Sequence, residues 1–234
     1  FEPEILSKER RASNQGIIVD YDKHGGRWYN ALIRAYKAEN IKIIGEKGSQ
    51  IDGMDCYDEM GEEQYRGPHA ICIIKCSNVY LSGYEIINSS NWAHCVWYSN
   101  NIEINNISVL AGHDGCHFKH CRNIYIHDSN FSTGDDCVAG YNNRNITVEN
   151  CSFSLRYPLW HTEGFTLADC TMDELTRAAI WYAKDGKITD SDLGGIKAVR
   201  ECRNIHIKGT EIVSQEFGWK SSGISLEDSS VTAE

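Results

Sequence analysis

A repeated phrase dominates this sequence. From residue 78 onward its copies are separated by 23, 22, 22, 19, 22, 18 and 19 residues. Each copy begins with Asn or Gly and continues with alternating apolar residues, a period of two that predicts short β-strands bounded by turns. The copies are NIKIIG at 40, NVYLSG at 78, NIEINN at 101, NIYIHD at 123, NITVEN at 145, GFTLAD at 164, GKITDS at 186, NIHIKG at 204 and GISLED at 223.

This period constrains the architecture. At about 3.3 Å per strand residue, roughly 20 residues can wrap once around a small core. A single coil cannot bury its own apolar edges, so coils have to stack on their neighbours. The sequence therefore predicts an all-β fold, a single-stranded right-handed parallel β-helix of about nine coils. A barrel or a sandwich would need hairpin turns and no fixed step, so we set both aside.

Charge and composition exclude several classes of binding partner. The formal net charge of −10 argues against nucleic acid, because phosphate binding needs clustered Lys and Arg. The same charge disfavours a long acidic polymer unless a local basic patch overrides it. No apolar run is long enough to span a bilayer, so we expect no membrane partner. Residues 1–20 lack the order of a signal peptide, which leaves a cytoplasmic and a secreted bacterial location both open.

The ten cysteines follow the repeat and contain no CxxC pair, so a structural zinc site is not expected. The pattern predicts an inward-facing stack of small apolar thiols. Three positions recur: Cys72, Cys95, Cys116 and Cys137 at steps of 23, 21 and 21 residues; Cys76, Cys121 and Cys202, each two residues before a repeat Asn; and Cys151 with Cys170.

The repeat asparagines have two interpretations. Asn145 stands in the repeat position, where stacked side-chain amides can bond along a column of turns. We therefore interpret these asparagines as turn residues before glycosylation acceptors. The N-x-S/T triplets begin at Asn88, Asn106, Asn145 and Asn150.

A cluster of aspartates departs from the apolar pattern. Aligning the coils on Cys116 and Cys137 places Asp114 over Asp135, with Asp136 beside them, and Gly134 predicts a bend that turns these side chains outward. Carboxylates this close push at least one pKa upward, which can supply a general acid and a general base together. Cleavage of a glycosidic bond needs that pair. The alternative is that the aspartates cap turns, and the spacing favours neither interpretation.

HDGCHFKHCRN and TGDDCVAG, within residues 28–153, resemble the polygalacturonase-type glycoside hydrolases. That resemblance implies a pectin lyase-like β-helix that hydrolyses pectic polysaccharides with inversion. It implies Asp135 as the general acid and Asp114 with Asp136 as the pair that activates water. Inverting enzymes hold their carboxyls about 6.5–9.5 Å apart, so these side chains would have to splay.

The sequence also departs from that family. Gly112-His113 replaces its Asn-Thr, the Gly-His-Gly expected one coil after Gly-Asp-Asp is missing, and no Arg-x-Lys follows. His161 is present but late and without flanking glycines. We expect His113, His117 and His161 to contact sugar. Adjacent strand residues alternate between faces, so a metal shared by His117 and His120 is not expected.

The last third of the sequence resembles a different group of proteins from residues 28–153. Residues 154–234 resemble an uncharacterised group of bacterial β-helix proteins, and the period shortens there. We expect one β-helix domain over residues 1–234, with coils of two kinds that meet near residues 151–157. Contacts in a solenoid are mostly between neighbours, which tolerates such a junction. A recombined or engineered chain and a natural divergent relative both remain open.

Three functions follow. The first is hydrolysis of a pectic or related polysaccharide by the aspartate trio, without a cofactor. The second is a catalytically inactive solenoid, serving as a scaffold or a glycan-binding module. The third is a calcium-dependent lyase, which a chelator would stop. For partners we expect a polysaccharide or oligosaccharide, and edge-to-edge self-association through the open strand edges of a solenoid.

Overall fold

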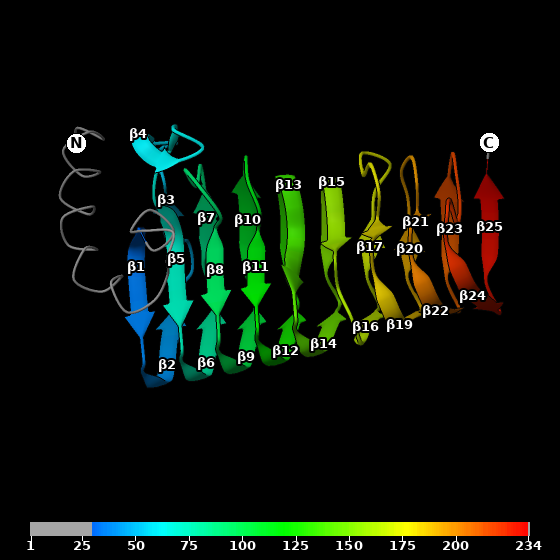
Figure 1. Cartoon of the computed structure of the whole chain (residues 1–234), viewed down its shortest axis with the longest axis horizontal. Coiled ribbons are helices and arrows are strands. Elements are labelled where there is room, and N and C mark those ends of the chain that lie inside the picture. The colour runs from blue at the N-terminus through cyan, green and yellow to red at the C-terminus, as the bar shows by residue number, and fades with distance from the viewer. Residues whose placement is uncertain (1–29, 234) are drawn as a thin grey trace.

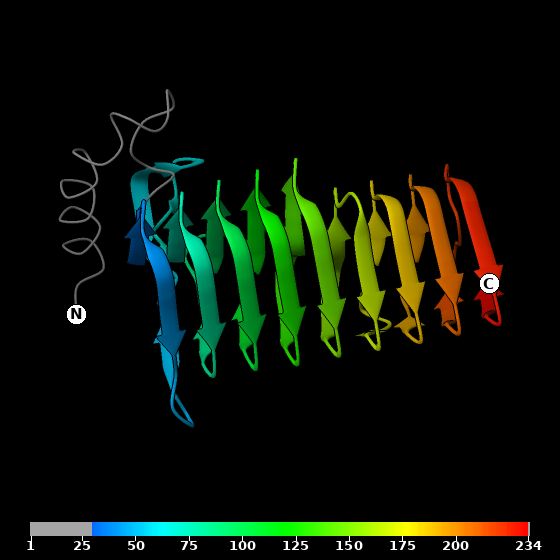
Figure 2. The same ribbon diagram turned by 90° about the horizontal axis from the view of Figure 1, so that it is seen from below.

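The computed structural model describes residues 30–233 as a right-handed parallel β-helix. The coils stack along one axis from β1 to β25, and the strands form three faces (Figures 1 and 2). No helix occurs within the described residues, and so none there could cross a membrane. Residues 1–20, where we expected no signal peptide, lie outside the described part. The predicted fold class is confirmed.

One face, here called the repeat face, contains one strand from each repeated phrase. Its nine strands pair in order and in parallel, with each phrase over the phrase of the preceding coil. The phrase predicted to begin at Gly186 is one residue out of step, because Asp185 lies opposite Asn204. These strands are β2 (Glu39–Ile44), β6 (Ser77–Ser82), β9 (Asn100–Asn105), β12 (Arg122–His127), β14 (Arg144–Glu149), β16 (Phe165–Ala168), β19 (Lys184–Thr189), β22 (Arg203–Lys208) and β24 (Ser222–Glu227).

The other two faces are joined by two long strands, β13 (Asn130–Tyr141) and β15 (Ser152–Trp160), which cross the corner between them. β13 and β15 pair in parallel on both sides of this corner, with a shift of one residue in register between Thr133 and Asp136. The first face has β1 (Ala31–Tyr36), β5 (His69–Ile74), β8 (His94–Trp97), β11 (Cys116–Lys119), β18 (Ile180–Trp181) and β21 (Val199–Arg200). The second has β3 (Gln50–Asp52), β7 (Glu85–Ile87), β10 (Ser108–Ala111), β17 (Thr171–Met172), β20 (Asp192–Leu193), β23 (Glu211–Ser214) and β25 (Ser230–Ala233); β4 (Tyr57–Glu62) lies outside both.

The repeat asparagines form the predicted ladder. Asn101, Asn123 and Asn145 each have φ near +55° and donate a side-chain hydrogen bond of 2.9–3.0 Å to the same position one coil earlier. Asn tolerates this left-handed conformation better than most residues. The ladder stops at Gly164, which has no side chain, and resumes where Asn204 donates to Asp185 at 2.9 Å. The turn interpretation of these asparagines is confirmed.

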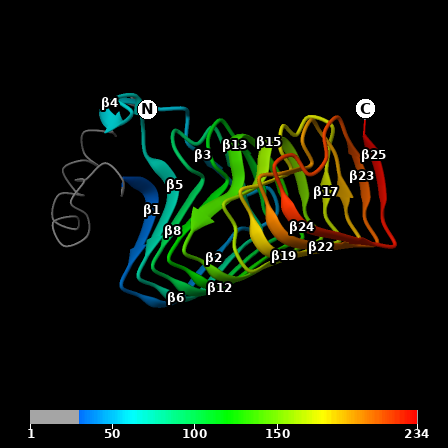
Figure 3. The same cartoon turned by 45° about the vertical axis from the view of Figure 1, so that its right-hand side comes forward.

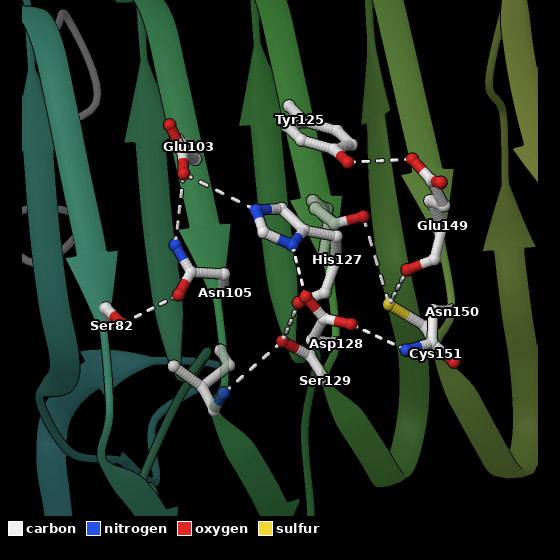
Figure 4. Close-up of polar contacts among 12 residues, drawn as sticks. Ser82, Glu103, Asn105, Tyr125, His127, Asp128, Ser129, Glu149, Asn150 and Cys151 are labelled. Carbon is white, nitrogen blue, oxygen red and sulfur yellow. Dashed lines mark hydrogen bonds and ion pairs between the residues drawn. The ribbon is translucent and has the colours of Figure 1, made fainter.

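A second column of turns ends the repeat face, and Figure 4 shows its polar contacts. Asp128 and Asn150 both have positive φ, and the Asn150 amide donates to Asp128 at 2.5 Å. His127 also contacts Asp128, at 2.6 Å through its Nδ1. Beside them, Tyr125 donates to Glu149 at 2.7 Å, which raises the pKa of this tyrosine to about 12. These side-chain bonds hold each coil to the next at the turns. Figure 3 shows the stack of coils in an oblique view.

The cysteine alignment was partly wrong. All ten cysteines are buried and free, but Cys116 pairs with Val138 rather than with Cys137. The step between these coils is 22 residues, not 21. Cys72 and Cys95 do pair, yet their side chains point away from the main core and pack under Trp92 and Trp97. Only part of the set therefore faces inward.

Candidate active site

The bend in β13 places two of the three aspartates. Residues 130–133 pair with β10 and residues 138–141 pair with β11, so the strand changes face within Gly134-Asp135-Asp136-Cys137. A Cβ on Gly134 would lie 2.4 Å from the carbonyl oxygen of Gly112, so only glycine permits this approach. The bend predicted at Gly134 is present, and it brings Asp135 and Asp136 to the corner.

Asp114 reaches the same corner from the preceding coil. The amide of Gly115 donates to the carbonyl oxygen of Asp136 at 2.8 Å, which places Asp114 over Asp136. The predicted pairing of Asp114 with Asp135 was wrong by one residue, for the same reason as the cysteine alignment. The cluster nevertheless forms, because one carboxylate oxygen of each aspartate lies within 4.8 Å of the others. The predicted splaying to the inverting range is not seen between these oxygens.

Burial and mutual repulsion set the charge of the cluster. The exposed fractions of Asp114 and Asp136 are only 5% and 9%. Burial raises the pKa of Asp136 to about 9, and the charges of Asp114 and Asp135 add to the rise. Burial and Asp114 also raise the pKa of Asp135, while Arg156 and Arg66 oppose that shift. At neutral pH Asp136 therefore keeps its proton.

His117 is fixed against the cluster. Its Nδ1 lies 2.8 Å from an oxygen of Asp114. Its ring lies flat on Trp92, with centroids 3.8 Å apart and planes 5° apart. Trp92 is itself buried, so the stack holds the imidazole in one orientation. His117 can therefore orient the Asp114 carboxylate.

The other two predicted histidines lie in different places. His113 precedes Asp114, and its ring contacts Tyr65 with centroids 6.3 Å apart; burial and Arg66 lower its pKa. His161 is exposed in the turn after β15, four residues beyond Tyr157, which pairs with Asp136. That separation is about 13 Å along the strand. The structure brings His113 and His117 to the cluster and does not bring His161.

Two arginines next to the cluster were missed. Arg156 precedes Tyr157 and so lies beside Asp135, and the Arg177 amide bonds the Arg156 carbonyl at 2.8 Å. Both side chains are exposed. The positions 135, 156 and 177 differ by 21 residues each, so extending the coil alignment past Asp135 would have found them. They form a local basic patch that follows the aspartates along the axis.

Three clustered carboxylates could also hold a cation. Oxygen ligands of this kind suit Ca²⁺ or Mg²⁺. The raised pKa values of Asp135 and Asp136 oppose such binding, because a protonated carboxyl is a poor ligand.

Comparisons with known proteins identify the region that carries the cluster. A sequence model described as glycosyl hydrolases family 28 matches residues 15–155, and one described as protein of unknown function (DUF3737) matches residues 137–234. A probable polygalacturonase of Vitis vinifera is 32% identical over 127 residues, 50% of this chain and 26% of its own length. A polygalacturonase of Medicago sativa is 26% identical over 161 residues, 60% of this chain and 37% of its own length. This chain therefore spans about a quarter to two fifths of these relatives.

A solved structure supports the fold. Endo-xylogalacturonan hydrolase from Aspergillus tubingensis superposes with a TM-score of 0.67 at 17% identity, covering 87% of this chain and 73% of that one. At this identity the likeness concerns the β-helix fold alone.

Proposed function

Because this chain belongs to glycosyl hydrolases family 28, we propose that it hydrolyses glycosidic bonds of a pectic or related polysaccharide at the aspartate cluster. The observation that supports this most strongly is the convergence of three carboxyls at one bend, two of them with raised pKa values. Turn capping needs one carboxylate at a turn and gives no reason to bring three together with two of them buried.

Each carboxyl has a distinct part in the proposed reaction. Asp135 is the most exposed of the three and has a raised pKa, so it donates the proton to the glycosidic oxygen. Asp114, oriented by His117, accepts a proton from the attacking water. Asp136 shares that water site, and its retained proton gives the water a hydrogen-bond donor. The proton gained by Asp114 then returns to Asp135, which restores the cluster.

The exposed arginines Arg156 and Arg177 supply the substrate preference. They lie in successive coils, about 4.8 Å apart in the backbone, directly after Asp135. Arginine pairs well with carboxylates, because its guanidinium can donate two parallel hydrogen bonds. A uronic-acid chain that lies along the axis would present its carboxylates to these two arginines. Their positive charge would offset the repulsion between an acidic polymer and a protein with a net charge of −10.

The proposal is tested by release of reducing ends from polygalacturonate, xylogalacturonan and rhamnogalacturonan. We expect release from at least one of them, unchanged by a chelator, and NMR of the first product should show the inverted anomer. No release by folded protein would leave an inactive solenoid as the better conclusion. Loss of release with a chelator would instead indicate the lyase, and a retained anomer would mean that a carboxylate acts as nucleophile.

The arginine patch gives a separate prediction. Arg156→Gln and Arg177→Gln should each lower kcat/KM on polygalacturonate about 10-fold to 100-fold, as expected for one charge-assisted hydrogen bond. Fully methyl-esterified pectin has no free carboxylates, so its residual rate should not change. Lys187→Gln, an exposed cation on the repeat face, is the matched control. Equal losses on both substrates would contradict carboxylate recognition.

A further inference from the structure

The break in the asparagine ladder coincides with a cavity. The cavity has a volume of about 530 Å³ and lies where Gly164 interrupts the ladder between Asn145 and Asp185. It lies at the turn that follows β11, whereas Asp114 of the aspartate cluster precedes that strand. Its lining includes Arg122, Arg144, Asn145, Glu163, Gly164 and Asp185.

Two arginines dominate the charge of this cavity. Arg122 and Arg144 are direct partners at the starts of β12 and β14, and both are exposed. Like charges in register on neighbouring strands repel each other. Within residues 30–233 neither guanidinium forms an ion pair or a side-chain hydrogen bond. The pair therefore has donors to offer an anion.

The acidic residues of the cavity are already engaged. Glu163 forms an ion pair of 2.8 Å with Lys184, and Asp185 accepts a hydrogen bond from Asn204. The Asn145 amide donates to Asn123, which leaves its carbonyl oxygen on the side of Gly164. The space thus combines a cationic pair with amide and carboxylate groups that suit hydroxyls.

The geometry points to a binding site for one carboxylate-bearing sugar unit in this cavity, with the carboxylate between Arg122 and Arg144. The sugar hydroxyls would face Asn145 and Asp185. A volume of about 530 Å³ is in the usual range for small-molecule pockets and exceeds what a bare oxyanion needs. This site goes beyond the proposed function, because binding there needs neither the aspartates nor turnover.

The test measures binding in a chain whose cleft arginines have been removed. Galacturonate, galactose and inorganic phosphate are titrated by NMR and calorimetry into the Arg156→Gln/Arg177→Gln variant. We expect galacturonate to bind, galactose not to bind, and phosphate to bind at least tenfold more weakly. Arg122→Gln/Arg144→Gln in this background should abolish binding. Arg203→Gln, in the same column two coils after Glu163, should leave it unchanged.

A cavity-filling variant separates shape from charge. Gly164→Asn keeps both arginines, and its φ of +64° with no atom within 4 Å of a Cβ can accept asparagine. It should restore the ladder, preserve the fold and remove galacturonate binding. The inference is overturned if galacturonate binding is absent, survives loss of both arginines or survives Gly164→Asn. Equal affinity for phosphate would overturn the sugar specificity. Hydrolysis lost without loss of this binding would count against the proposed function alone.

Discussion

Asp136→Asn is expected to lower the rate of hydrolysis and, at the same time, to stabilise the fold above pH 6.5. The amide of the asparagine still donates a hydrogen bond to the attacking water but cannot exchange a proton with Asp114 and Asp135, so kcat should fall by about 10²-fold. The stabilisation follows from the raised pKa of Asp136. The unfolded carboxyl ionises near 3.8, whereas the folded one keeps its proton to about 9. Its contribution to stability is therefore fully present below pH 3.8 and is lost as the pH rises toward 9.

Buried His94 changes the stability of the fold in the opposite direction, at acid pH. Its Nδ1 lies 3.0 Å from the carbonyl oxygen of Gly115 and its Nε2 3.0 Å from the hydroxyl of Tyr84. Burial lowers its pKa from 6.5 to about 4, so its contribution is present above pH 6.5 and is lost as the pH falls toward 4. Between its unfolded and folded pKa values, each group changes the free energy of unfolding by about 1.4 kcal/mol per pH unit. Asp136 lowers it as the pH rises, whereas His94 raises it.

The free energy of unfolding should therefore be nearly level between pH 4 and 6.5 and should fall between pH 6.5 and 9. In Asp136→Asn it should rise up to pH 6.5 and then stay level, so the variant gains about 2 kcal/mol over the parent protein by pH 8. Urea unfolding at four pH values measures this. Asp135→Asn should lose hydrolysis with a smaller gain, because Asp135 is less buried. Asp192→Asn, on an exposed side chain, should change neither quantity. A destabilised Asp136→Asn at pH 8 would contradict the buried proton.

Phe165 and Gly186 give the second large effect. They lie at equivalent positions on the neighbouring strands β16 and β19, in a column of residues that face the core. Ile146 precedes them in this column and Ile205 follows them. The Phe165 ring fills the space left by the missing side chain, because a Cβ on Gly186 would lie 2.1 Å from it. Gly186→Val should therefore destabilise the fold by about 3 kcal/mol through overpacking. Phe165→Val alone should lower stability by about 2–4 kcal/mol by leaving a cavity.

The double variant Phe165→Val/Gly186→Val should recover most of both losses, because the two valines together nearly replace the original volume. The coupling energy, measured by urea unfolding in a double-mutant cycle, should reach about 2 kcal/mol or more. Simple additivity of the two losses would show that the ring and the glycine do not share the space.

The repeat period and the residues at the turns were enough to predict most of the fold. A step near 22 residues with period-two alternation already required stacked parallel coils, and each repeat phrase became one strand of the repeat face. The asparagine ladder was predictable because the left-handed turn conformation and the amide ladder both favour asparagine at one position. These are local preferences, repeated often enough for the sequence to reveal them.

What the sequence by itself determined was which carboxyls exist and roughly which coils carry them. Tertiary structure decided their register, since a single residue of misalignment moved the partner of Asp114 from Asp135 to Asp136. It also decided their protonation, because burial depends on packing across several coils. The place of Arg156 and Arg177 beside Asp135, and the cavity at Gly164, likewise depend on how successive coils lie over one another. Spacing along a chain is local, whereas register, burial and cavities are properties of neighbouring coils in contact.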